Sequence, residues 1–153
     1  MDLWRICRAR RARTAFDGEG ARRYPGRWNH RNVPAVYCAS SLSLAALEYF
    51  VHLDPDELPD DLVSIRASLP DHVAVEHVDR RGLPPDWRRS PGPDELRDIG
   101  SEWLDSMRTV ALIVPSAVTP SETNILLNPR HPDIGKLARS APEPFAFDRR
   151  MRR

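Results

Sequence analysis

The sequence has few of the residues that support metal, redox or membrane roles. Its 153 residues include 2 cysteines, Cys7 and Cys38, and neither has a further cysteine or a histidine at zinc-ligand spacing. Two cysteines are also too few for a disulfide framework. No apolar run reaches the roughly 20 residues that cross a bilayer, and no apolar signal core follows the first arginines. We therefore expect a cytoplasmic protein that has no metal site and does not insert into a membrane.

Three common catalytic motifs are also missing. The histidines show no HExxH spacing, which gives a zinc protease no support. The segment Gly18-Glu19-Gly20 has neither the later glycine spacing nor the strand–turn–helix context of a dinucleotide-binding GxGxxG loop. Ser116 has no GxSxG elbow around it, so a serine hydrolase is equally unsupported.

Neither sign of charge dominates the chain. It has 23 basic and 22 acidic residues, a formal net charge of +1, and Lys136 is its one lysine. Binding of nucleic acid by overall charge is therefore excluded, although a local patch of arginines remains possible. A non-enzymatic nucleic-acid-binding module is an alternative interpretation, but no RNP, KH or helix-turn-helix pattern supports it. Such a module would use Arg22, Arg23, Arg27, Arg88, Arg89 and the basic tail at 140–153.

The pattern of prolines and apolar residues predicts one α+β domain over residues 1–153. Fifteen prolines break the chain into short elements, and 41% of its residues are hydrophobic, which is enough for one core. We predict an irregular loop at 9–32 and a basic tail at 140–153, whose last residues are disordered. We predict strands at 3–8, 35–39, 109–114 and 124–128, a hairpin of 62–69 with 72–78, and helices at 42–53 and 94–106.

Glu48 lies in the middle of the helix predicted at 42–53. This helix has almost no polar face, so we expect it to be buried nearly all round, with His52 a core residue. A buried carboxylate must be neutralised, paired or used in chemistry. A structural ion pair with an arginine and a catalytic role are equally supported by the residues themselves.

Two further segments carry candidate functional residues. Arg27 lies between a glycine, which permits close approach, and Trp28, which can stack on a ring, so the segment can grip a phosphate and a ring together. The alternative is a solvated basic loop that Trp28 anchors to the core. Ser116 ends an apolar strand and is either a binding hydroxyl or a turn serine.

Four ordered blocks of sequence together resemble the RES domain, from the opening LWRI to the closing FAFDRR. They are GRWN at 26–29, AVYCASSLSLAALE at 35–48, IGSEWL at 99–104 and VPSAVTPSETNILLNPRHPDI at 114–134. The family is named for an arginine, a glutamate and a serine, which match Arg27, Glu48 and Ser116. The resemblance implies a compact mixed-sheet α+β fold similar to that of ADP-ribosyltransferase toxins. It also implies a bacterial toxin that acts on NAD.

The chemistry that the resemblance implies is cleavage of the bond between nicotinamide and ribose. Glu48 then stabilises the positive charge that develops on the sugar. Arg27 holds the diphosphate or an incoming phosphate, and Ser116 positions ribose or nicotinamide. NAD is thus a substrate, and inorganic phosphate, water or a protein side chain is the acceptor. We favour phosphorolysis or hydrolysis, with ADP-ribosylation of a host protein as the alternative.

Four more residues are candidate substrate contacts; the first three have packing as their alternative role, and the last has a turn-forming role after the strand. They are Arg5, Trp28, Tyr37 and Asn128. The resemblance also implies a partner, an Xre-type helix-turn-helix antitoxin. We expect the antitoxin to block the active site near Arg27 and Glu48, and the toxin to contact DNA only indirectly, through the antitoxin.

Overall fold

The computed structural model of the chain describes residues 1–54 and 58–151. Its strands are β1 Asp2–Arg8, β2 Val36–Ala39, β3 Leu62–Ser68, β4 Val75–His77, β5 Ala111–Pro115, β6 Thr123–Leu127, β7 Ala138–Arg139 and β8 Glu143–Phe145. Its α-helices are α1 Glu19–Arg23, α2 Leu42–Phe50 and α3 Asp94–Ser106, and its 3-10 helices are η1 Ala9–Thr14, η2 Arg80–Gly82, η3 Pro132–Lys136 and η4 Arg149–Met151. Within these residues no helix is both long and apolar enough to cross a membrane.

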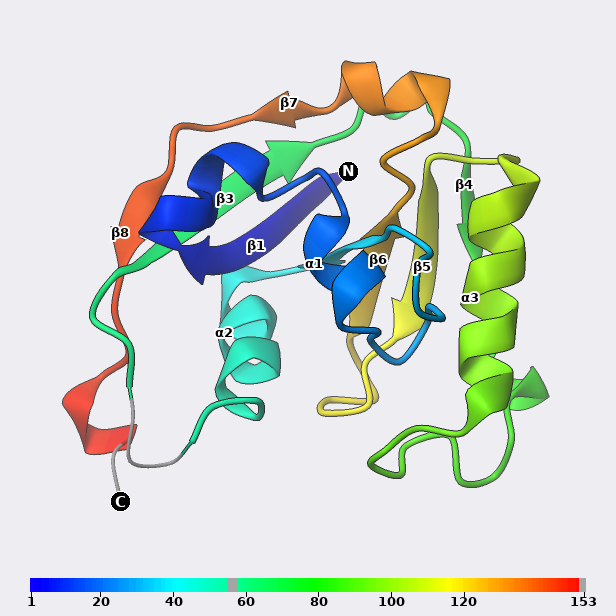
Figure 1. Ribbon diagram of the computed structural model, residues 1–153, viewed down its shortest axis with the longest axis horizontal. Helices are drawn as coiled ribbons and strands as arrows, with labels where there is room; N and C mark the ends of the chain where they lie inside the picture. The colour runs from blue at the N-terminus through cyan, green and yellow to red at the C-terminus, as the bar shows by residue number, and fades with distance from the viewer. Residues whose placement is uncertain (55–57, 152–153) are drawn as a thin grey trace.

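The strands form one mixed sheet in the order β4-β5-β6-β2-β1-β3-β7, and β8 pairs with β3 as well. β4 and β5 are parallel, and every other pair is antiparallel. In Figure 1, α2 and α3 lie on either side of β5 and β6. The predicted mixed-sheet α+β fold is therefore confirmed.

The sheet is weakly joined between β1 and β2. β1 pairs with β3 along its whole length, from Asp2 to Arg8, whereas its register with β2 consists of the pair Trp4–Ala39. A side chain supplements this short backbone ladder, because Arg5 Nη1 donates a hydrogen bond to the Tyr37 carbonyl at 2.5 Å. The candidate site described below lies against this junction.

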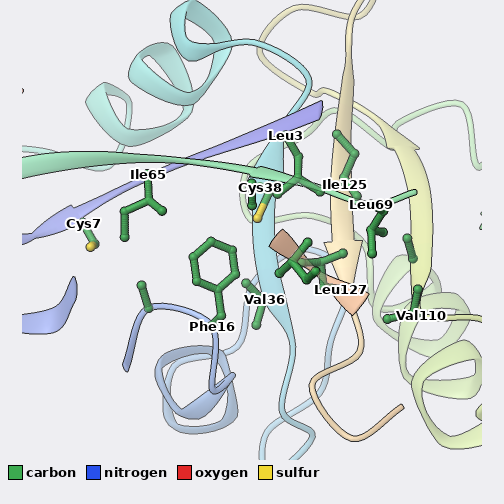
Figure 2. Close-up of a cluster of buried hydrophobic side chains, with 14 of the residues drawn as sticks. Leu3, Cys7, Phe16, Val36, Cys38, Ile65, Leu69, Val110, Ile125 and Leu127 are labelled. Carbon is green, nitrogen blue, oxygen red and sulfur yellow. The ribbon is translucent and has the colours of Figure 1, made fainter. Parts of the chain in front are cut away.

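One core cluster fills the space between the sheet and the segment after η1. Figure 2 shows Phe16 of that segment facing side chains of β1, β2, β3 and β6, among them Leu3 and Leu127. Both cysteines are buried in this cluster. Burial raises the pKa of both thiols, that of Cys38 to about 12. The cysteines therefore act as small core residues.

α2 begins as predicted but is shorter and less buried than expected. The Ser41 hydroxyl caps its N-terminus by accepting a hydrogen bond from the Leu44 N–H at 3.1 Å. The helix ends at Phe50, and Val51, which follows it, is 53% exposed. The prediction that the helix is buried nearly all round is wrong, because one face packs on the sheet and another borders a cleft.

The hairpin predicted from 62–69 and 72–78 does not form. β3 pairs with β1, β7 and β8, while β4 pairs in parallel with β5 at the far edge of the sheet. The turn residues between the two apolar runs have the composition of a hairpin turn. Long-range pairing instead places each run beside a distant strand, and a local pattern does not reveal such partners.

The segments predicted to be irregular contain regular structure. The stretch 9–32 holds η1 and α1, and an ion pair between Arg22 and Glu19 at 2.8 Å supports α1. In the tail, β8 adds to the sheet and Phe147 is 8% exposed, packed against Tyr49 and Phe50 of α2. Of the tail's last residues, 149–151 form η4 and 152–153 lie outside the described residues.

Candidate active site

A cleft of about 720 Å³ opens against the junction of β1 and β2. This volume lies within the roughly 300–1,000 Å³ of small-molecule and cofactor sites. Its lining comes from both strands, from α2, from the loop after α1, from the loop before α3 and from the ends of β5 and β6. The charged lining residues are Arg5, Arg27, Glu48, Arg88 and Arg97.

Glu48 is the carboxylate of this cleft and is held in a fixed position. Its Oε1 accepts hydrogen bonds from Ser116 Oγ at 2.7 Å and from Asn124 Nδ2 at 2.6 Å. Among the described residues Glu48 forms no ion pair within 4.0 Å, so the structural ion pair considered from the sequence is not what holds it. Two neutral donors therefore orient a carboxylate that no cation of the described residues pairs with.

Ser116 lies behind Glu48 and does not line the cleft. It is fully buried, and besides donating to Glu48 its Oγ accepts hydrogen bonds from the backbone N–H groups of Val118 at 3.1 Å and Thr119 at 2.9 Å. These two donors fix the hydroxyl so that its proton points at the carboxylate. The geometry gives Ser116 the role of positioning Glu48.

Sequence reasoning missed Asn124 as a functional residue. It begins the apolar stretch of β6, lines the cleft and donates to Glu48, while its own Oδ1 is buried without a partner among the described atoms. The polar residue at the start of an apolar strand was a signal, but no pattern in the chain links position 124 to position 48.

Arg27 reaches into the cleft from the loop after α1. Its Nη1 donates to the carbonyls of Trp87 at 2.6 Å and Arg89 at 2.9 Å, which ties it to the loop before α3. A Cβ at Gly92 would lie 2.7 Å from the same Nη1, so a glycine there allows the loop to close over the guanidinium. Partial burial lowers the pKa of Arg27, and Arg97 lowers it further by charge repulsion, whereas Glu48 raises it.

A hydrogen-bond network shapes the loop that carries Arg27. The buried Asn29 accepts from the Gly26 N–H at 2.9 Å and from the Tyr37 hydroxyl at 2.7 Å. The Tyr37 hydroxyl also accepts from the Trp28 N–H at 3.0 Å. Burial raises the pKa of Tyr37, so this phenol stays protonated and can donate. Tyr37 thus lines the cleft and also fixes the loop.

Helix α3 holds the other side of this loop. A Cβ at Gly100 would lie 1.8 Å from the Trp28 carbonyl oxygen, so the helix can approach only because the residue is glycine. Beside it, Ser101 Oγ accepts a hydrogen bond from the His30 N–H at 2.9 Å. Arg97, one turn earlier, donates from Nε to the Gly26 carbonyl at 3.2 Å. α3 therefore fixes the backbone on both sides of Arg27.

Arg5 and Trp28 line the cleft, whereas Asn128 lies outside its lining. Arg5 has a buried Nε with no partner among the described atoms, which leaves a donor beside the cleft. Trp28 borders the cleft but is 2% exposed and packs in the core under α3. Asn128 is fully buried outside the lining, where it donates to the Leu104 carbonyl at 2.7 Å, at the end of α3. Trp28 therefore packs as a core residue at the border of the cleft. Asn128 makes the contacts of the turn-forming role considered from the sequence, because its Oδ1 accepts a hydrogen bond from the Arg130 N–H at 3.1 Å.

His52 also differs from its predicted place. It is exposed and borders the cleft instead of lying in the core, because α2 ends before it.

Comparison with known proteins gives matches to a family, to related proteins and to a solved structure. The RES domain family matches residues 2–148. A protein of Yersinia enterocolitica named "Toxin Res" is 39% identical over 153 residues, covering 99% of this chain and 100% of the relative. A protein of a Sphingobium species named "Prs ADP-ribosylating toxin" is 39% identical and covers 97% and 95% of the two chains. A chain in the crystal structure of the M. tuberculosis MbcT-MbcA toxin-antitoxin complex has the same fold, with a TM-score of 0.73, 19% identity and coverage of 95% of this chain and 84% of that chain.

Proposed function

The chain belongs to the RES-domain family, and we propose that it is a toxin that cleaves the bond between nicotinamide and ribose in NAD. One observation carries the proposal: Glu48, the carboxylate of an arginine-lined cleft, is oriented by two neutral donors and not neutralised by a cation. An anion kept free in this way is suited to stabilise a cation that forms during a reaction.

In the proposed reaction the glycosidic carbon–nitrogen bond breaks first. Its electron pair leaves with nicotinamide, which becomes neutral, and the ribose takes on the positive charge of an oxocarbenium-like state. Glu48 faces that charge from α2. Ser116 and Asn124 keep the carboxylate oriented by their bonds to Oε1, so no reorganisation is needed as the charge develops. Arg5 and Arg27 bind the phosphates, and Tyr37 offers a flat face to a ring.

The acceptor completes the reaction at the same carbon. A phosphate oxygen that forms the new bond gives ADP-ribose 1″-phosphate. A water molecule gives ADP-ribose and releases one proton. We favour these two acceptors because NAD depletion alone is toxic and needs no docking surface for a protein.

A second candidate function is ADP-ribosylation of a host protein. The observation that favours it is the Sphingobium relative, which is 39% identical and named an ADP-ribosylating toxin. The bond that breaks and the role of Glu48 are the same, and only the nucleophile differs. Transfer of ADP-ribose to a protein in a host lysate, with little free ADP-ribose, would favour this candidate.

We further propose that an Xre-type helix-turn-helix antitoxin silences the toxin in the cytoplasm by covering this cleft. Exposed apolar residues support this, since Tyr24 is 80% and Val51 53% exposed and both border the opening. In such a complex the antitoxin contacts DNA, and the toxin does so only indirectly. A purified complex that keeps full NAD-cleaving activity would contradict occlusion.

The proposed function can be tested by induced expression of the Glu48→Gln variant. The amide oxygen of glutamine can still accept from Ser116 and Asn124, so the fold is kept while the charge is lost. We expect intracellular NAD to stay at the uninduced level and growth to continue. Glu122→Gln is the matched control, because Glu122 lies outside the cleft lining, and it should remain toxic. A toxic Glu48→Gln variant would overturn the proposal.

A further inference from the structure

The charges around the cleft are unbalanced. Four arginines and one carboxylate are its charged lining residues within the part of the chain that the structure describes. Three of the arginines, Arg5, Arg88 and Arg97, come from β1, from the loop before α3 and from α3 itself, so folding brings them together from distant positions. Like charges in a partly buried site repel each other unless an anion binds between them.

Arg97 is the arginine of this group to which the sequence assigned no role. Its side chain is 25% exposed, and its Nε donates to the carbonyl of Gly26, the residue before Arg27. The two guanidinium groups are close enough that Arg97 lowers the pKa of Arg27. Arg97 also pairs with Asp94 at 2.7 Å, but Asp94 is 78% exposed, and exposed ion pairs of this kind are weak.

Each guanidinium keeps a free face. Arg27 uses Nη1 for the carbonyls of Trp87 and Arg89, and Arg97 uses Nε and Nη1 for Gly26 and Asp94. Within residues 1–54 and 58–151, neither Nη2 donates a hydrogen bond to a protein atom. The contacts that are made fix both groups in place, and the unused donors are those that remain for a ligand.

We propose that Arg97 is a second phosphate-binding residue, which with Arg27 forms a site for the two linked phosphates of a dinucleotide. This inference rests on the proposed function and adds to it a preference for a dinucleotide substrate over a mononucleotide. Two arginines that span a diphosphate favour NAD over nicotinamide mononucleotide, which has the same scissile bond but one phosphate. Because Arg97 does not reach Glu48 by any hydrogen bond or ion pair, it contributes to substrate binding and not to bond cleavage.

The test is the kinetics of nicotinamide release from NAD and from nicotinamide mononucleotide by the wild type, Arg97→Ala and Arg97→Lys. Arg31→Ala is the control, since Arg31 is exposed and outside the cleft lining. For Arg97→Ala we expect KM for NAD to rise about tenfold, or about 1.4 kcal/mol. We expect kcat of Arg97→Ala for NAD to stay within about twofold of the wild type, and KM for the mononucleotide to rise less than KM for NAD. Arg97→Lys should recover part of the lost affinity for NAD. An unchanged KM for NAD, or an equal loss with both substrates, would overturn the inference.

A binding measurement separates this inference from the proposed function. Calorimetric titration with ADP requires no cleavage, and ADP carries the same two linked phosphates. We expect Arg97→Ala to weaken ADP binding about tenfold relative to the wild type and to Arg31→Ala. If the wild type releases no nicotinamide, the proposed function fails, yet ADP binding that depends on Arg97 still supports the diphosphate site. ADP binding that is equal in wild type and Arg97→Ala would contradict it.

Discussion

The Asn124→Ala substitution is expected to reduce activity while leaving the fold almost as stable as before. Asn124 donates to Glu48 Oε1 at 2.6 Å, and a hydrogen bond to a charged group contributes about 1.5–3 kcal/mol. Its Oδ1, however, is buried without a partner in the described structure, and an unsatisfied buried acceptor costs about 1–3 kcal/mol. The two effects of the substitution on the free energy of unfolding therefore oppose each other, and we expect a net change within about 1 kcal/mol.

No comparable effect offsets the loss of catalytic activity in Asn124→Ala. Without Asn124, Ser116 alone orients the carboxylate, and loss of about 1.5–3 kcal/mol of transition-state stabilisation lowers kcat roughly 10- to 160-fold. The assays are nicotinamide release at saturating NAD and urea unfolding followed by circular dichroism. KM should change little, because the bond acts on Glu48 and not on the substrate.

Asn128→Ala provides the matched control. It removes another buried asparagine of the same segment, whose amide binds the Leu104 carbonyl at 2.7 Å and which lies outside the cleft lining. This variant should lose about 1–3 kcal/mol of stability and keep its kcat per folded molecule. Wild-type kcat in Asn124→Ala, or a parallel loss of stability and activity in both variants, would contradict a positioning role for Asn124.

Three further variants test other parts of the structure. Phe147→Ala should lower the free energy of unfolding by about 3–5 kcal/mol in urea titrations, because it empties the aromatic contact with α2; an unchanged midpoint would contradict that packing. Gly26→Ala should reduce nicotinamide release strongly, since its Cβ would lie 2.6 Å from Tyr37 Cζ, and full activity would show that the loop shape does not matter. The buried Cys38 keeps its proton in the folded state, so stability should fall by up to about 1.4 kcal/mol per pH unit as pH rises above 9.0 toward about 12. Cys38→Ala should reduce that slope and leave the part that Cys7 and Tyr37 cause, and a slope equal to that of the wild type would contradict the assignment.

The sequence predicted most elements but not their partners. The apolar runs at β1, β2, β5 and β6 and the helices α2 and α3 were found where the structure has them, because local periodicity reports local structure. The pairing of β4 with β5 follows from the crossover through α3, and the turn composition before β4 pointed instead to a hairpin. The residues of a turn predict the turn itself, but they do not predict which distant strand pairs with the apolar run that follows.

The candidate site likewise combines residues that the sequence identified with contacts that only the fold reveals. Glu48 could be predicted because it is a carboxylate on an apolar helix, and the family resemblance added Arg27 and Ser116. The bond between Ser116 and Glu48 spans 68 positions in the chain, and no local pattern encodes it. No sequence pattern singled out Arg97, and only the fold places it beside the Arg27 loop.

In the proposed function, Glu48 makes this cleft an NAD-cleaving site. The most direct test incubates the purified, partner-free protein with NAD, with and without inorganic phosphate, and identifies the products by mass spectrometry. We predict that the wild type releases nicotinamide and that Glu48→Gln slows this release by about 100-fold or more. ADP-ribose 1″-phosphate formed only with phosphate identifies phosphorolysis, and ADP-ribose in both conditions identifies hydrolysis. Intact NAD in every reaction of the folded wild-type protein would contradict the claim.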